Sequence, residues 1–172
     1  MSNRIKWISQ TAVMTALLLV LQFATKPLGQ IVTGSCVNAV LAVTCLIAGI
    51  GSGISVAILS PIFAFILGIG PQLFPLTPAI AAGNCVLVLL LNILCKDSLS
   101  TPRRIIACIA ASFCKFVTLN VLIVQVLCRI LELAEKQVAM FSTMFSWPQL
   151  FTAIIGTIIA LIIAPRIKNA IK

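Results

Sequence analysis

The chain has 172 residues, of which 61% are hydrophobic and only 9% are charged. A soluble domain carries about 25% charged residues, so this composition excludes an ordinary soluble protein and indicates a polytopic membrane protein in a lipid bilayer. The formal net charge of +9 would suggest nucleic-acid binding in a soluble protein. Here the excess of basic residues in cytoplasmic loops explains it more simply, and we expect no nucleic-acid partner.

Six apolar segments approach the length of about 17–25 residues that a membrane-spanning helix needs. We therefore predict an all-α integral membrane protein in which a single domain, residues 1–172, forms a compact bundle of six transmembrane helices. The segments are Trp7–Ala24, Ile31–Ile50, Ile54–Ile69, Pro78–Cys95, Arg104–Arg129 and Trp147–Ala164. The third is the shortest, so five spans, or a third segment that re-enters the membrane, remain alternatives.

The distribution of basic residues predicts the orientation of the bundle. With both termini in the cytoplasm, the inner side carries eight basic residues and the outer side three, as the positive-inside rule requires. The inner set is Arg4, Lys6, Lys96, Arg103, Arg104, Arg166, Lys168 and Lys172, and the outer set is Lys26, Arg129 and Lys136. The first apolar segment is longer than the core of a signal peptide, about 7–15 residues, so we expect it to be a retained helix in a multi-pass protein of the cell membrane.

The chain contains no histidine, and none of its seven cysteines forms a Cys-x-x-Cys pair. We expect no metal site and no cofactor, and we expect the cysteines to pack as small hydrophobic side chains. The absence of histidine excludes intramembrane proteases of the Ser-His and zinc types. No activated nucleophile with a base beside it can be assembled from these residues, so we predict no catalytic residue and no enzymatic activity.

The tetrapeptide Pro-Gln-Leu-Phe occurs twice, at residues 71–74 and 148–151, and residues 29–34 read GQIVTG. Two interpretations remain open. Proline is a good helix starter and glutamine an ordinary interfacial residue. Alternatively, three helical hairpins repeat and bring similar polar segments around one outward cavity, as repeats do in transporters. The uncharged loop at 68–78 is either a hydrophobic lid or a segment that dips into the membrane interface.

Lys115 is a cation deep inside a predicted span. It lies about 16 Å along a helix axis from Arg104, in a hydrocarbon core about 30 Å thick. Helical spacing places Thr118, Gln125 and Arg129 on the same stripe. The only acids fall in predicted loops and are poorly placed to pair with Lys115: Asp97, Glu132 and Glu135. Lys115 therefore snorkels to the interface as an anchor, is neutral or hydrated, or binds an anionic ligand such as a carboxylate.

Amide and hydroxyl side chains in other spans complete a candidate binding site. Such groups can simply bond one helix to another. Several, however, lie in the outer half of the predicted bundle, and apolar walls with a few fixed polar groups suit a small-molecule pocket. The candidate substrate-binding residues are Gln30, Thr33, Asn38, Gln72, Asn84, Lys115, Gln149 and Thr152.

The first predicted helix carries a stripe of small residues, Ser9, Ala12 and Ala16. Such stripes let helices approach closely, within one chain or between chains. The Ala-x-x-x-Ala pattern near the cytoplasmic end of the first of six helices resembles the substrate-binding S components of energy-coupling factor (ECF) transporters. The stretches VTGSCVNAVLA at 32–42, PAIAAGN at 78–84 and PQLFTAIIG at 148–156, together with Lys115, add to this resemblance.

The resemblance implies an outward-facing site for a vitamin or similar micronutrient. It also implies that Ser9, Ala12 and Ala16 dock on a transmembrane coupling subunit driven by two cytosolic ATPase subunits. The chain has no G-x-x-x-x-G-K-[ST] phosphate loop, which agrees with ATP hydrolysis by partners. Two other functions remain open from the residues alone: a self-contained small membrane transporter, and a non-transport membrane scaffold.

Overall fold

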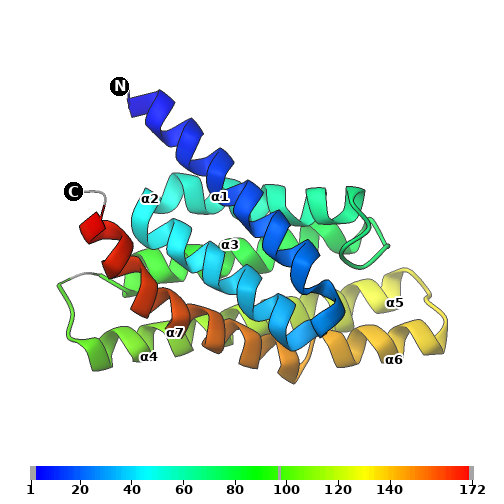
Figure 1. The fold of residues 1–172 in the computed structure, drawn as a ribbon. Coiled ribbons are helices and arrows are strands. Elements are labelled where there is room, and N and C mark those ends of the chain that lie inside the picture. Colours follow the sequence, from blue (N-terminus) through cyan, green and yellow to red (C-terminus); the bar gives the residue numbers. More distant parts are fainter. Residues whose placement is uncertain (1–2, 97, 171–172) are drawn as a thin grey trace.

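The computed structural model describes residues 3–96 and 98–170, so Asp97 and Lys172 lie outside the described part. The prediction of an all-α protein is confirmed for that part, which contains helices and no strand. The elements are α1 (Asn3–Thr25), η1 (Lys26–Leu28), α2 (Gln30–Ile66), α3 (Leu76–Leu94), α4 (Thr101–Leu119), η2 (Asn120–Leu127), α5 (Cys128–Ile130), α6 (Glu135–Met144) and α7 (Trp147–Ala170) (Figure 1).

Five helical stretches in the described ranges are long and apolar enough to cross a membrane. They are Arg4–Leu28, Gln30–Ile66, Leu76–Leu94, Thr101–Ile130 and Glu135–Ala170. The difference from six arises at α2, which joins the second and third predicted spans in one stretch of 37 residues. The protein is thus a multi-pass membrane protein, while six bilayer crossings remain a prediction that requires both parts of α2 to cross.

The backbone of α2 is broken at Gly49, where φ is 86° and ψ is 176°. This combination is almost confined to glycine, because a Cβ would clash with the backbone. Cys45 and Gly53 would lie about 12 Å apart in a straight helix, yet a Cβ added to Gly53 would lie 3.4 Å from Cys45 Cα. Figure 1 shows the ribbon of α2 reversing direction. It is a hairpin of a first limb, residues 30–48, and a second limb, residues 50–66.

The fifth predicted span is also interrupted in its winding. Residues Asn120–Leu127 form the π-helical segment η2 between α4 and α5. A further short helix, α6, lies between the fifth and sixth predicted spans, where the sequence analysis expected a loop. Because η2 lacks the 3.6-residue repeat of an α-helix, residues after Leu119 do not keep the positions relative to Lys115 that α-helical spacing predicts.

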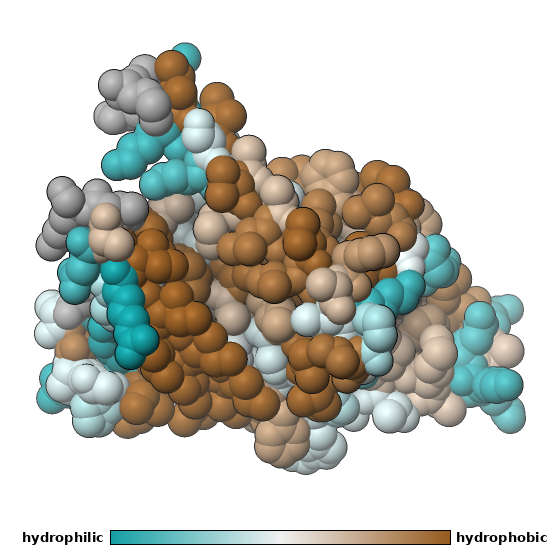
Figure 2. Space-filling model, in the orientation of Figure 1, coloured by the Kyte–Doolittle hydropathy of each residue, from teal (hydrophilic) through white to brown (hydrophobic). Residues whose placement is uncertain are grey.

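Helix α1 begins and α7 ends at the same end of the bundle, which agrees with termini on one side of a membrane (Figure 1). The space-filling view shows apolar residues over the middle of this face and polar residues gathered toward its two ends (Figure 2). Such a band is what a bilayer core and its two interfaces select. The assignment of the termini to the cytoplasm remains a prediction.

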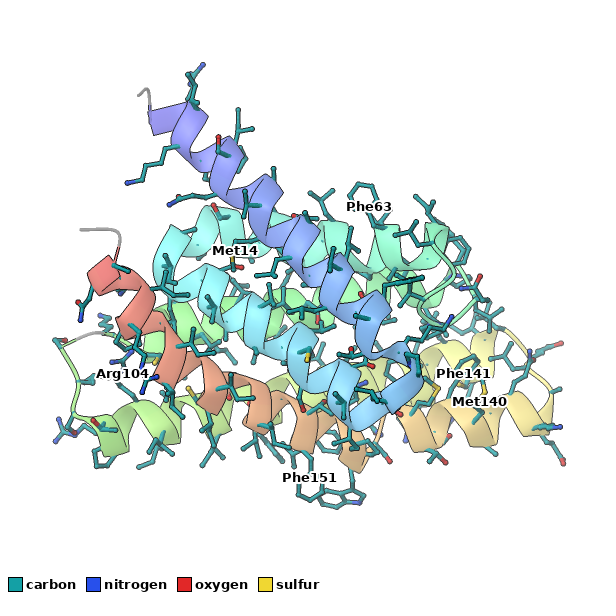
Figure 3. All side chains as sticks on the ribbon, in the orientation of Figure 1. Met14, Phe63, Arg104, Met140, Phe141 and Phe151 are labelled. Atoms are coloured by element: carbon teal, nitrogen blue, oxygen red, sulfur yellow. The ribbon has the colours of Figure 1, made fainter. Side chains whose placement is uncertain are left out.

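Two hydrophobic clusters pack the bundle. The larger surrounds α2 and includes Leu41, Val56 and Leu87, all completely buried. The smaller lies where α3, η2 and α6 meet, and it contains Ile123 and Phe141. Figure 3 places Arg104 toward the end that holds the termini and Phe141 toward the opposite end.

Candidate functional site

Lys115 is buried inside the bundle with only 3% of its surface exposed. Its Nζ donates hydrogen bonds to Asn38 Oδ1 at 2.6 Å and to Asn84 Oδ1 at 2.7 Å. These side chains come from α4, the first limb of α2, and α3. An ammonium group has three N–H donors, and the two amides accept two of them. The side chain thus points into the bundle and is not stretched toward an interface. We call Lys115, Asn38 and Asn84 the lysine–amide cluster.

The amide of Asn38 is held in one orientation. Its Nδ2 donates to Gly34 O at 2.8 Å and makes a longer contact of 3.4 Å with Thr152 Oγ1. Thr152 in turn donates to Gln149 O at 3.1 Å. With its nitrogen bound to the backbone of its own helix, Asn38 must present its oxygen to Lys115. Thr152 therefore contacts the nitrogen of the Asn38 amide, while the oxygen of that amide binds Lys115.

Helix α7 lies directly against the backbone of α2 at this level. A Cβ added to Gly156 would lie 2.6 Å from Asn38 Cβ and 2.7 Å from both Ala39 N and Ser35 O. These distances leave no room for a larger residue, and backbone atoms cannot move aside as a flexible side chain can. Glycine at 156 thus permits the close approach that fixes Asn38 in front of Lys115.

The cluster borders a cavity of about 270 Å³ in the half of the bundle away from the termini. Six of the eight predicted site residues line it, namely Gln30, Thr33, Asn38, Asn84, Lys115 and Gln149. Apolar side chains, including Val37, Ile80 and Leu119, form much of its wall. The cavity combines apolar walls with a few fixed polar groups, which is the usual composition of a small-molecule site.

The remaining two predicted site residues lie outside the cavity wall. Thr152 is 1% exposed and acts through Asn38. Gln72 is exposed, and its Nε2 donates to Gly70 O within its own loop. That loop still contributes to the site, because Gly70 and Pro71 line the cavity.

The connection between η1 and the loop after α2 closes one side of the cavity. Lys26 Nζ donates to Gly68 O at 2.8 Å, and Lys26 itself lines the cavity. The ring of Phe74 packs edge-on against that of Phe65, with ring centres 5.5 Å apart. These contacts hold the uncharged loop over the cavity in this structure.

The polar stripe expected along the helix of Lys115 does not reach the cavity. Gln125 and Arg129 are exposed and bind each other, with Arg129 Nη2 donating to Gln125 Oε1 at 3.2 Å. The π-helical winding of η2 is the physical reason, because it changes the angle between successive residues. Only the Lys115 position of that stripe contributes to the site.

Gln22 and Ser60 also line the cavity but were not among the predicted site residues. The sequence offered a weak signal for Gln22, which lies four residues before Lys26 and so shares its helix face. Ser60 gave none, because an isolated serine in an apolar segment is ordinary.

Two lysines line the cavity. Lys115 and Lys26 line it, and no aspartate or glutamate does so within the described ranges. Glu132 and Glu135 are exposed near α5 and α6. Among residues 3–96 and 98–170, no group of three potential metal ligands comes together. The arrangement is therefore suited to bind an anionic organic molecule through hydrogen bonds and charge.

A comparison with protein-family models matches residues 7–168 to the substrate-specific component of ECF transporters. No curated protein and no solved structure gives a significant match. The family match covers nearly the whole chain, including every residue of the cavity and of the lysine–amide cluster. This membrane protein belongs to the family of ECF transporter substrate-specific components.

Proposed function

We propose that this protein is the substrate-capture subunit of an ECF importer in the cell membrane, and that it binds a small carboxylate-bearing micronutrient such as a vitamin. The observation that carries the proposal is the lysine–amide cluster at the cavity wall. Among the described residues, the Lys115 ammonium is bound by neutral amide oxygens only. A carboxylate would supply the missing charge and accept the third N–H of Lys115 in a charge-assisted hydrogen bond.

The size of the cavity supports a small substrate. Its volume of about 270 Å³ lies just below the range of about 300–1,000 Å³ typical of sites for drug-sized ligands. In the predicted topology the cavity lies in the outer half of the bundle, since it is remote from the termini. A nutrient captured from outside the cell would enter there.

The exposed face of α1 supports docking on a coupling subunit. Ser9, Ala12 and Ala16 are all exposed. The same helix packs on α2 with a different face, on which Thr11 and Leu18 are buried. A small-residue stripe left open on a membrane helix permits close packing of another helix. We propose that the coupling subunit binds this stripe and that two cytosolic ATPase subunits supply the energy.

Gentle purification from the native host, followed by native mass spectrometry, tests the proposal. We expect the chain to retain a small organic acid and to appear together with a membrane subunit and ATPases. The Lys115→Met variant should lose the acid, with affinity at least about 30-fold lower, because truncating one partner of a buried charged pair costs about 2–5 kcal/mol. Cys114→Ser, which changes the adjacent exposed residue, should retain it.

Docking is tested separately with Ala12→Leu. This variant should bind the acid normally and lose the coupling subunit, because the larger side chain blocks close helix approach. Ala24→Leu provides a matched control, since it makes the same change at an exposed position near the other end of α1. Normal assembly of Ala12→Leu would contradict the proposed docking face, and acid binding unaffected by Lys115→Met would contradict the proposed binding site.

A further inference from the structure

Two buried polar atoms at the cavity have no hydrogen-bond partner among the described residues. They are Gln22 Oε1 and Ser60 Oγ. Ser60 is 2% exposed, and both residues line the cavity. Leaving such a group buried and unpaired costs about 1–3 kcal/mol, so these two positions require an explanation.

The two atoms belong to one seam between α1 and the second limb of α2. These segments are joined at one level by a hydrogen bond from Thr11 Oγ1 to Ser52 Oγ, at 3.0 Å. They are joined again farther along, through the 2.8 Å bond from Lys26 Nζ to Gly68 O. Gln22 and Ser60 lie between these two levels in their respective segments. We call Gln22 and Ser60 together the α1–α2 seam.

The seam and the lysine–amide cluster approach the cavity from different segments. Lys115, Asn84 and Asn38 lie on α4, α3 and the first limb of α2, whereas Gln22 and Ser60 lie on α1 and the second limb of α2. Apolar residues such as Val37 and Ile80 line the cavity as well. A molecule that fills the cavity would therefore contact Lys115 at one place and the uncharged pair Gln22 and Ser60 at another. It would contact apolar side chains as well.

The chemistry of the seam specifies what it would bind. A glutamine Oε1 only accepts hydrogen bonds, and a serine hydroxyl both donates and accepts. The complementary group must therefore carry an N–H or O–H donor for Gln22. A second carboxylate could not satisfy Gln22 Oε1, because an ionised carboxylate is acceptor-only.

We infer that the α1–α2 seam binds the second polar end of the transported molecule, and that the substrate is a small organic acid carrying an N–H or O–H donor away from its carboxylate. This inference rests on the proposed function, since Lys115 must hold the carboxylate end. It adds the substrate class and assigns Gln22 and Ser60 as the residues that select it.

The test uses a defined mixture of small monocarboxylic acids as the probe. Each member carries an amide, ureido or hydroxyl donor remote from the carboxylate, and each is paired with the analogue methylated at every such N–H or O–H. Native mass spectrometry of the purified full-length protein measures which members are retained. We expect the wild type to favour donor-bearing acids over their methylated partners by about tenfold, the value of one net hydrogen bond.

Gln22→Leu and Ser60→Ala should each reduce that preference toward unity, with melting temperatures unchanged or raised, because each removes an unpaired buried polar group. Ser52→Ala is a matched control on the same helix. Ser52 is bonded to Thr11, so this change should lower the melting temperature and leave the preference intact. A control that loses stability but keeps the preference would show that the seam variants lose their preference for a reason other than destabilisation.

The outcomes distinguish the two proposals. Equal retention of donor-bearing and methylated acids, or a preference that survives in both seam variants, would overturn the inference and leave the carboxylate site standing. Retention of no acid by the wild type would overturn carboxylate recognition and the inference together. Lys115→Met should retain neither class of probe.

Discussion

The lysine–amide cluster and the α1–α2 seam line the same cavity but differ in how their polar atoms are satisfied. In the cluster, the Lys115 ammonium and the oxygens of Asn38 and Asn84 bind one another at 2.6–2.7 Å. In the seam, Gln22 Oε1 and Ser60 Oγ have no partner among the described residues. The cluster therefore stabilises the fold through its own hydrogen bonds, and substrate binding is the role we propose for it in addition. The two unpaired atoms of the seam make no such contribution among the described residues.

This difference predicts different consequences of mutation. Removing one member of a satisfied buried network leaves the others unpaired, so stability and binding should fall together. Removing a member of the seam should weaken binding without lowering the melting temperature. Variants of Gly156, Asn84 and Lys26 test this difference, with expected effects that decrease in that order.

Gly156→Ala should disrupt the lysine–amide cluster by displacing Asn38 from the side of α7. The new Cβ would meet Asn38 and the α2 backbone at 2.6–2.7 Å, so α7 must move away or Asn38 must shift. Overpacking of this kind costs typically about 1–3 kcal/mol, and we expect a lower melting temperature together with loss of acid binding. Thermal unfolding in detergent and probe retention measure both effects.

Gly70→Ala is the matched control for this change. A Cβ there would lie 3.8 Å from its nearest neighbour, Ala64 Cβ, which is an ordinary contact. Its melting temperature should match that of the wild type. If Gly156→Ala were equally stable and bound acids normally, the rigid support assigned to α7 would be incorrect.

Asn84→Asp should separate the two roles of the cluster. The new carboxylate would stand 2.7 Å from Lys115 Nζ and would neutralise it within the chain. We expect the melting temperature to be maintained or raised and the affinity for acids to fall by about 100-fold, because the ligand then competes with an internal anion.

Asn84→Leu is the comparison for this experiment. It removes one of the two acceptors of Lys115 and supplies no charge, so it should lower the melting temperature. Acid binding by Asn84→Asp at wild-type strength would show that Lys115 is not the group that binds the carboxylate.

Lys26→Met should have the smallest effect. This side chain is exposed and binds a loop carbonyl, and exposed polar contacts are weak and screened by salt. We expect a few-fold loss of acid affinity at low ionic strength and almost none at high ionic strength. Binding across a salt series measures it. A loss as large as that of Lys115→Met would place the main anion site at the cavity mouth.

Much of the architecture followed from the sequence. Apolar segment length predicted the helices, and the unbalanced cation Lys115 predicted a polar centre, because both follow from the cost of exposing charge to lipid. The small residues of α1 predicted a close helix contact, within the chain or with a partner. These features depend on local composition, which one sequence displays directly.

Other features depended on three-dimensional packing and could not be read from the chain. Ser60 lines the cavity only because α2 folds back at Gly49. An isolated serine before a proline does not indicate such a position in the sequence. Gln72 shared a tetrapeptide with the region of Gln149, yet it bonds within its own loop. The expected stripe from Lys115 to Arg129 assumed α-helical winding where η2 is a π-helix.

The π-helical segment η2 also connects parts of the chain that pack beside the cavity. Lys115 and Leu119 precede it on α4, and Ile123 within it packs in the same cluster as Leu119, Phe141 and Phe145. Leu119 and Phe145 both line the cavity. The wall that contains Phe145 thus shares one hydrophobic cluster with Leu119, which lies one turn after Lys115, so two sides of the cavity are packed against each other.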